Sequence, residues 1–140
     1  DSGEVQKAEM YAHDMLGNLK AGTEACFDWN LLLNEEGGPN HVGNFCAAPV
    51  MGVKKGGIEK RLPYYYIGHF SRYVRPGARR ILTSCFTEDL ETLAFQNTDG
   101  SRAVVLLNRT EKDIPVSLVE NGEGICLESG AHTICTVILE

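Results

Sequence analysis

The chain has 140 residues, of which 43% are hydrophobic, and its formal net charge is −6 at pH 7. This length suits an ordinary domain that buries roughly 68% of its unfolded surface, and the apolar fraction is typical of a folded chain. The negative charge argues against general binding of nucleic acid. No stretch of the sequence approaches the ~20 apolar residues of a membrane span.

The sequence opens with a pattern that predicts a helix followed by a strand. Apolar residues recur at helical spacing over residues 4–20, and Asp1 is placed to form a capping box with Glu4. Residues 25–33 form a nearly continuous apolar run, which is typical of a parallel strand covered on both faces. A lone parallel strand has unsatisfied edges, so we expect residues 25–33 either to lie unpaired or to pair with another chain or with a segment outside these 140 residues.

An irregular stretch is expected after this strand, as far as about Arg61, because glycines break every periodicity in it. Pro63 then fits the first turn of a helix that continues over residues 64–74. From Ala78 onward, β-rich runs alternate with turn signals, of which Asp99-Gly100 is a strong hairpin signal. These runs predict much of a β-sandwich and cover residues 79–86, 91–97, 102–108, 114–119, 124–128 and 132–139.

The most informative segment is DWNLLLNEEGGPNH, residues 28–41, because it holds Trp29, the one tryptophan of the chain. Asparagines and two glutamates surround this indole along the sequence. A flat ring can stack on the C–H face of a pyranose while neighbouring amides bond its hydroxyl groups. The segment therefore suits a sugar pocket.

Three segments in collinear order resemble the C-terminal stretch of glycoside hydrolase family 30, the glucosylceramidase-like enzymes. They are DWNLLLNEEGGPNH, YYYIGHFSRYVRPGARRI and DGSRAVVLLNRTEKDIPV, and the likeness runs from about Tyr11 to the end. The resemblance implies a (β/α)8 TIM barrel with an attached β-sandwich. It also implies hydrolysis of a β-glycosidic bond with retention, by two glutamates at the ends of barrel strands.

The chain departs from this family pattern because neither family glutamate has a matching position in it. The family's first sandwich strands, which come from the N-terminus of the full protein, have none either. We therefore interpret residues 1–77 as a C-terminal fragment of the catalytic barrel and residues 78–140 as most of the β-sandwich. Both catalytic carboxylates are expected upstream of residue 1, so the chain alone is expected to be inactive.

Three residues are candidates for substrate binding by this resemblance: Trp29, Asp28 and Asn44. The family places a tryptophan at the position of Trp29 against the sugar, whereas the alternative is a core tryptophan beside a strand. Asp28 is either an acceptor for hydroxyl groups or a residue that caps the strand end. Asn44 either reaches the same pocket or forms a turn.

The neighbouring polar residues have simpler interpretations. Asn30 would alternate to the opposite face from Trp29, which favours a structural hydrogen bond. Glu35 and Glu36 are adjacent on a loop, and this spacing favours loop anchoring or a solvated rim over an acid and nucleophile pair. The Gly37-Gly38-Pro39 turn is expected to use positive φ at its glycines. His41 either lines the rim of the pocket or lies in solvent.

The five cysteines have no spacing typical of a zinc site, so neither a metal nor an organic cofactor is implied. They lie in apolar sequence contexts and are expected to be small buried hydrophobes: Cys26, Cys46, Cys85, Cys126 and Cys135. Their odd number favours reduced thiols and a cytoplasmic setting, whereas the resemblance favours a secreted or periplasmic one. The compartment is therefore left open.

The leading hypothesis is that this chain is the C-terminal portion of a retaining β-glycosidase. Its expected partners are a carbohydrate or glycolipid substrate and either the rest of the barrel or another copy of the chain. The alternative is a non-catalytic carbohydrate-binding or interaction module formed by the β-rich half. That module needs an exposed aromatic platform, but residues 78–140 contain only Phe86 and Phe95 as aromatic residues.

Overall fold

The computed structural model describes residues 2–140, so Asp1, the expected helix cap, lies outside them. In chain order the elements are α1 (Ser2–Lys20), β1 (Leu32–Leu33), β2 (Val50–Gly52), β3 (Ile58–Lys60), α2 (Leu62–Ser71), β4 (Arg79–Ile81), β5 (Leu90–Gln96), β6 (Arg102–Asn108), β7 (Ile114–Glu120), β8 (Glu123–Ser129) and β9 (Thr133–Leu139). No helix among the described residues is long and apolar enough to cross a membrane.

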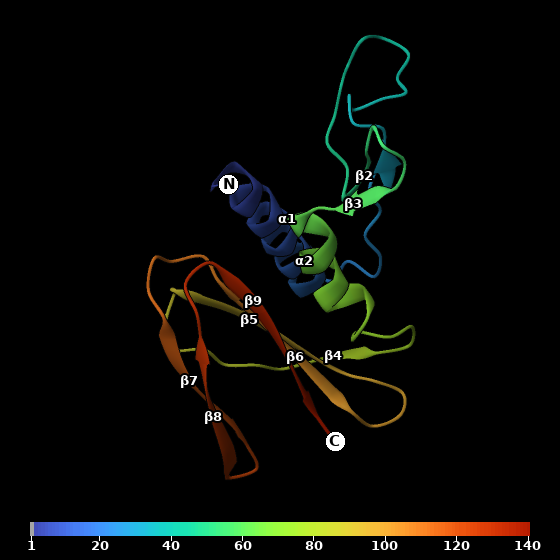
Figure 1. Cartoon of the computed structure of the whole chain (residues 1–140). Helices are drawn as coiled ribbons and strands as arrows, with labels where there is room; N and C mark the ends of the chain where they lie inside the picture. The colour runs from blue at the N-terminus through green and yellow to red at the C-terminus, as the bar shows by residue number, and fades with distance from the viewer. Residues whose placement is uncertain (1) are drawn as a thin grey trace.

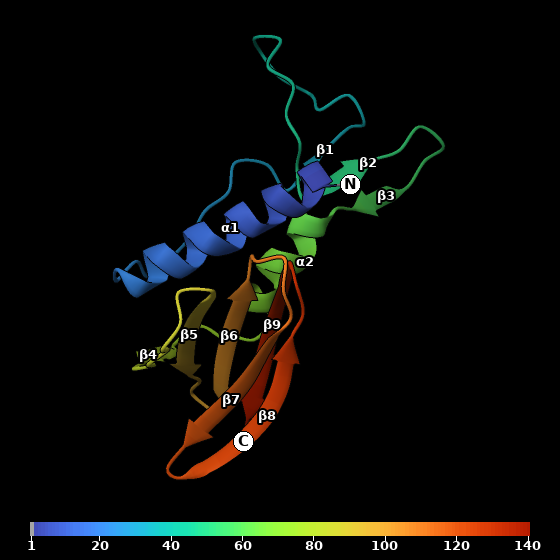
Figure 2. The same ribbon diagram turned by 90° about the vertical axis from the view of Figure 1, so that its left-hand side faces the viewer.

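An antiparallel sheet of order β4-β5-β6-β9 lies at the centre of the structure. Both helices cover one of its faces, and the two-stranded β7–β8 ribbon covers the other (Figures 1 and 2). Strand β6 is apolar at every position over residues 103–107, because alternate side chains point into two different cores. Ala103, Val105 and Leu107 are fully buried.

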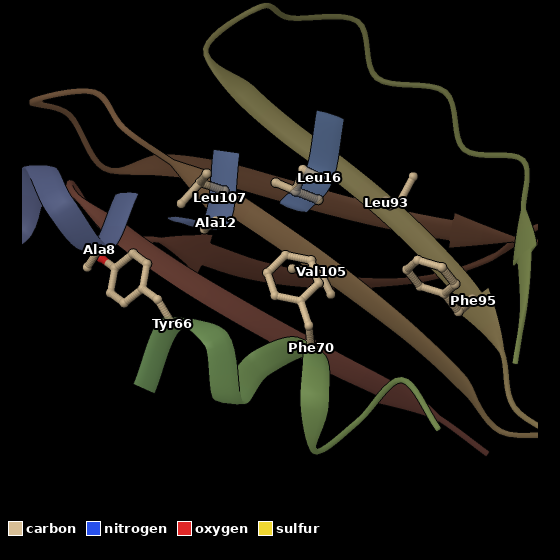
Figure 3. Close-up of a cluster of buried hydrophobic side chains, with 9 residues drawn as sticks. All are labelled: Ala8, Ala12, Leu16, Tyr66, Phe70, Leu93, Phe95, Val105 and Leu107. Carbon is tan, nitrogen blue, oxygen red and sulfur yellow. The ribbon is translucent and has the colours of Figure 1, made fainter. Parts of the chain in front are cut away.

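The larger core joins the helices to the sheet (Figure 3). Ala8, Ala12 and Leu16 recur every four residues on α1, which aligns them in one stripe facing the sheet. The small alanine side chains are fully buried and allow α1 to approach its neighbours closely. Tyr66 and Phe70 from α2 complete this core against β5 and β6. The helical half and the sandwich are thus packed together through one continuous apolar interface.

The second half of the chain forms strands where the sequence predicts them. The expected run at residues 102–108 coincides with β6. The other four runs expected after residue 90 correspond to β5, β7, β8 and β9, and their ends differ from these strands by at most one residue. The first run is an exception, because only Arg79–Ile81 of the expected 79–86 form a strand. Leu82 and Phe86 lie beyond it and are exposed, so nothing in the described residues pairs or covers that segment.

The expected strand at residues 25–33 is wrong for most of its length, since only Leu32–Leu33 form a strand, β1. This short strand pairs in parallel with β2 of the same chain, so the expectation of no partner within the chain is also wrong. Strands β2 and β3 fall inside the stretch expected to be irregular and form a small antiparallel pair. A parallel strand needs a neighbouring strand along its whole length, but β2 is only three residues long. Most of residues 25–33 therefore have no strand to pair with.

Two loops position the candidate site. Residues 23–31 run from the end of α1 to β1 without regular secondary structure, and residues 34–49 form a long excursion before β2. The excursion projects away from the helices and the sandwich (Figures 1 and 2). Most side chains in both loops are exposed. The segment with the candidate site residues is therefore the least covered part of the molecule.

Candidate functional site

The structure brings Trp29 and Asn44 together in one hollow of about 590 Å³. Trp29 comes from the loop before β1, and its indole is 91% exposed. Asn44 comes from the long excursion, fifteen positions later in the chain. The hollow is completed by Asn30, Leu33, Gly37, Pro39, Asn40, His41, Val42 and Cys46. An open aromatic ring thus faces a wall that carries several side-chain amides.

Asp28, the third candidate, does not line this hollow. It lies against α1 and α2, in hollows that also include Tyr11 and Tyr64. Its Oδ2 accepts a hydrogen bond from the Tyr11 hydroxyl at 2.8 Å, and its Oδ1 accepts one from the Trp29 backbone N–H at 2.8 Å. Burial and the contact with this carboxylate raise the pKa of Tyr11 to about 12. Asp28 is therefore tied to the scaffold on the side away from the hollow.

The turn after β1 is held by Asn34. Its Oδ1 accepts hydrogen bonds from the backbone N–H groups of Glu36 at 3.1 Å and Gly38 at 2.8 Å. Its own backbone N–H donates to the Gly38 carbonyl at 2.8 Å. This arrangement is an Asx-type turn, in which a short amide side chain replaces a backbone partner. It fixes the loop that forms one wall of the hollow.

Gly37 lets the excursion fold back onto this turn. Its φ is +83°, as expected, whereas the same expectation for Gly38 is wrong, because the φ of Gly38 is not positive. The Gly37 carbonyl accepts a hydrogen bond from the Cys46 backbone N–H at 3.1 Å. A Cβ at this position would lie 2.3 Å from the Cys46 carbonyl oxygen. Both the conformation and the close approach therefore require glycine. The contact closes the excursion and brings Asn44 to the same side as Trp29.

Of the remaining polar residues in the segment 28–41, Asn30 and His41 line the hollow, whereas Glu35 and Glu36 lie outside it. Asn30 lines the same hollow as Trp29, so its expected place on the opposite face is wrong, because residues 25–31 are not a strand. His41 lines the hollow as well. Glu35 pairs with Lys54 at 3.4 Å, which agrees with loop anchoring. Glu36 is exposed.

The hollow offers no charged group for bond cleavage. No carboxylate of the described residues lines it. Across residues 2–140 the structure also has no grouping of three or more His, Cys, Asp or Glu side chains placed to hold a metal ion. Retaining glycoside hydrolysis needs two carboxyl groups roughly 5–5.5 Å apart. In this chain, the Trp29 indole can stack on a polyhydroxylated ring, and the asparagine amides of the hollow can form hydrogen bonds with its hydroxyl groups.

A polar clasp at the interface between the helices and the sandwich was missed by the sequence analysis. His132 lies in the turn between β8 and β9 and has a φ of +53°. Its Nδ1 contacts Glu9 Oε1 of α1 at 2.8 Å, and its Nε2 contacts Glu111 Oε1 at 3.0 Å. These two glutamates raise the pKa of His132. The Tyr66 hydroxyl also donates to the His132 carbonyl at 2.8 Å, so both helices are tied to this turn.

The cysteines contradict the expectation that they are buried. Cys26, Cys46, Cys85 and Cys126 are exposed, and Cys135 is half-buried. All five thiols are free. Cys26 and Cys46 lie in the two loops beside β1, where most side chains are exposed. Burial raises the pKa of the Cys135 thiol, which favours its neutral form.

Comparison with known families gives two matches that together cover nearly the whole chain. Residues 1–74 match the TIM-barrel domain of glycosyl hydrolase family 30, and residues 77–137 match the β-sandwich domain of the same family. The resemblance inferred from the sequence motifs and the expected fold class are both confirmed by these matches. The structure accordingly holds part of a barrel beside a β-sandwich.

Named relatives give the same result. The chain is 38% identical over 118 residues to the lysosomal acid glucosylceramidase of Mus musculus, covering 83% of this chain and 23% of that enzyme. It is 26% identical to the endo-1,6-β-D-glucanase neg1 of Aspergillus fumigatus, covering 99% of this chain and 29% of the relative. The chain thus spans about a quarter of the length of these relatives.

Solved structures agree with the fold. The crystal structure of SrfJ from Salmonella typhimurium superposes with a TM-score of 0.95 at 40% identity, covering 99% of this chain and 32% of that one. The endo-β1,6-glucanase BT3312 superposes with a TM-score of 0.80 at 29% identity, covering 90% of this chain and 30% of that one. The arrangement of the helices, short strands and sandwich is therefore shared with larger proteins.

Proposed function

Because the chain belongs to glycosyl hydrolase family 30, we propose that it forms the C-terminal portion of a retaining β-glycosidase that acts on a carbohydrate or glycolipid. In this proposal residues 1–77 complete the catalytic barrel and residues 78–140 form most of the β-sandwich. The glucosylceramidase of mouse and the glucanase of Aspergillus fumigatus are both glycosidases by name, which supports this reaction class.

One observation carries the assignment of a role to this chain: the open indole of Trp29 and the amide of Asn44 share one hollow. An indole contributes a flat apolar face to a sugar ring, and an amide both donates to and accepts from its hydroxyl groups. We assign Trp29 and Asn44 to substrate positioning. Asn30 and Asn40 from the same wall supply further amides.

The bond-breaking chemistry is assigned to residues outside this chain. In double displacement, a glutamic acid protonates the departing oxygen while a glutamate attacks the anomeric carbon, and water then hydrolyses the glycosyl-enzyme. Glu35 is engaged by Lys54, and neither Glu35 nor Glu36 lines the hollow. Both catalytic carboxylates are proposed to come from barrel strands that precede residue 1.

Uncovered apolar surface supports the proposal that more of the same protein packs here. Phe27 is 96% exposed, Leu31 71% and Val42 85%, all in the two loops beside β1. Large apolar side chains gathered in this way mark a contact surface. We propose that the rest of the barrel covers them. A second copy of the chain is the other candidate, and it would make the isolated chain dimeric.

The sandwich also has apolar surface and strand edges that are left uncovered among the described residues. The β7–β8 ribbon pairs only within itself among the described residues. A groove of about 520 Å³, lined mainly by apolar side chains, runs between β7 and residues 81–87 over the sheet. An open edge beside an apolar groove favours a further strand. We assign this place to the sandwich strands that the family draws from the N-terminus of the full protein.

The proposal is tested in the full-length protein with an aryl β-glucoside as substrate. Trp29→Ala and Asn44→Ala are each expected to lower kcat/KM on the order of tenfold or more, because a misplaced substrate loses near-attack geometry. Trp29→Phe should restore part of the loss. Glu36→Gln, at an exposed residue outside the hollow, serves as the control with unchanged kcat. Turnover by the 140-residue chain alone that disappears in Glu35→Gln or Glu36→Gln would refute the assignment.

The alternative function, a carbohydrate-binding module in the β-rich half, is less well supported. Phe95 is buried in the core at 5% exposure, so Phe86 remains as the one exposed aromatic residue of residues 78–140. A single ring does not form a platform for an oligosaccharide. Titration of residues 78–140 with β-linked oligosaccharides distinguishes the two functions, because saturable binding there would favour the module.

A further inference from the structure

The loop that carries Trp29 has little to hold it in place. Among the described residues, no backbone–backbone hydrogen bond involves residues 24–30, and the nearest ones are Thr23 to the Asn18 carbonyl and Val50 to the Leu31 carbonyl. Packing does not hold the loop either, since Phe27 and Trp29 are both more than nine-tenths exposed. A loop without ladder bonds or buried side chains samples many conformations unless a side chain tethers it.

The tether is the pair of hydrogen bonds on Asp28. One carboxylate oxygen accepts from the Tyr11 hydroxyl at 2.8 Å, and the other accepts from the backbone N–H of Trp29 at 2.8 Å. Tyr11 lies one residue before Ala12, which is fully buried in the main core, so the hydroxyl is presented from a fixed helix. Hydrogen bonds to an ionised acceptor are roughly twice as strong as neutral ones.

We propose that Tyr11 is a positioning residue, which holds the Trp29 indole at the wall of the hollow through the Asp28 carboxylate. Asp28 then acts as the link between helix α1 and the loop and does not contact the substrate. This role differs from both interpretations of Asp28 that the sequence suggested, a hydroxyl acceptor and a strand-end residue. The inference rests on the proposed function for its catalytic consequence, but the tether itself does not depend on that function.

One observation supports the tether beyond the distances. Asp28 lines the hollows formed with Tyr11 and with α2, whereas Trp29 lines the hollow shared with Asn44, so the two neighbours face different sides of the loop. Burial and the contact with Asp28 both raise the pKa of Tyr11. The hydroxyl is therefore protonated at neutral pH and donates a hydrogen bond to the carboxylate.

The first measurement uses Trp29 as its own reporter, because it is the one tryptophan of the chain. Time-resolved fluorescence anisotropy, excited at the red edge of the indole band, measures the amplitude of fast local motion in the 140-residue chain. Tyr11→Phe and Asp28→Asn are each expected to increase this amplitude, and the double variant should add little, because both substitutions break the same link. Tyr65→Phe, which alters an exposed tyrosine of α2, is the matched control and should leave it unchanged.

The second measurement separates positioning from direct substrate contact in the full-length enzyme. If Asp28 is a link, Tyr11→Phe and Asp28→Asn should lower kcat/KM by a similar factor, roughly three- to tenfold for one lost hydrogen bond, and the losses should not multiply. If Asp28 binds the sugar directly, Asp28→Asn should cost far more than Tyr11→Phe, and the inference is then wrong.

The two proposals fail in different ways. Unchanged anisotropy in Tyr11→Phe would overturn the tether even if Trp29→Ala abolished activity. Full activity of Trp29→Ala would overturn the proposed role of the hollow, yet the increase in anisotropy on loss of the Tyr11 hydroxyl would remain. Comparable far-UV circular dichroism spectra and urea midpoints for Tyr11→Phe and the parent chain show that the variant is folded.

Discussion

The buried side chain of Asn108 gives the sharpest prediction about stability. It is 0% exposed at the end of β6. Its Nδ2 lies 2.7 Å from the Lys112 carbonyl, 3.0 Å from that of Ser129 and 2.9 Å from that of Gly130. Its Oδ1 accepts from the backbone N–H of Thr110 at 2.9 Å. One amide therefore joins the β6–β7 turn to the β8–β9 turn.

Asn108→Ala removes these bonds and leaves the backbone groups of a buried bond, at Ser129, and of part-buried bonds, at Lys112, Gly130 and Thr110, without this partner. A lost hydrogen bond costs about 0.5–1.5 kcal/mol, and a buried group left unsatisfied costs about 1–3 kcal/mol. Two or three such losses at this site give an expected decrease of roughly 2–4 kcal/mol in the free energy of unfolding. With a typical urea slope of about 2 kcal/mol/M, the unfolding midpoint should fall by roughly 1–2 M.

The assay is urea unfolding of the chain, monitored by far-UV circular dichroism, because Trp29 is too exposed to report on the core. Asn108→Asp keeps the shape but replaces the donor with a carboxylate facing three carbonyls. It should therefore destabilise at least as much at pH 7 and recover partly when the carboxyl group is protonated. Gln96→Ala, an exposed amide on β5, is the control and should stay within about 0.5 kcal/mol. A loss below about 1 kcal/mol in Asn108→Ala would refute the reasoning.

Two further predictions concern the clasp and the excursion. Glu9 and Glu111 raise the pKa of His132 in the folded state. The protonated imidazole therefore stabilises the fold fully below the pKa of the unfolded state, near 6.5. This contribution is lost as the pH rises through the pKa of the folded state. His132→Gln should thus lower the urea midpoint at pH 5.5 and differ little from the parent chain at pH 8.5; an equal difference at both pH values would contradict this. Gly37→Ala should open the excursion, because its Cβ would lie 2.3 Å from the Cys46 carbonyl oxygen. Limited proteolysis should then cut residues 34–49 several times faster, whereas Gly43→Ala, with nothing within 4 Å of the added Cβ, should change the rate less.

The sandwich is the part of the fold that sequence pattern predicts best. Its strands carry their own turn signals, and short turns join β5 to β6 and β7 to β8, so local sequence determines these two pairings. The Asp99-Gly100 turn between β5 and β6 is an example. The pairing of β9 with β6 is not local, because the β7–β8 hairpin lies between them in the chain. Strand β4 is shorter than predicted because residues 82–86 have no partner strand among the described residues.

The helical half is predicted less well because it depends on partners that are distant in sequence. The apolar run at residues 25–33 has the composition of a barrel strand, yet only Leu32–Leu33 find a partner, in β2. The same run explains why Asn30 was placed on the wrong face, since strand alternation does not apply to a loop. The prediction that the cysteines are buried was wrong for a related reason, because Cys26 and Cys46 lie in loops whose side chains are mostly exposed.

The sequence by itself determined the family, and its motifs were enough to propose Trp29 as the centre of the candidate site. Motifs of fixed spacing carry that information locally, and no packing is needed to recognise them. Only the tertiary structure decided which neighbours share the hollow: Asn44 faces the indole across the folded excursion, whereas Asp28, adjacent in sequence, turns toward Tyr11. The direction of a side chain on a loop depends on the hydrogen bonds that distant elements offer to it, and these exist only after the helices have packed.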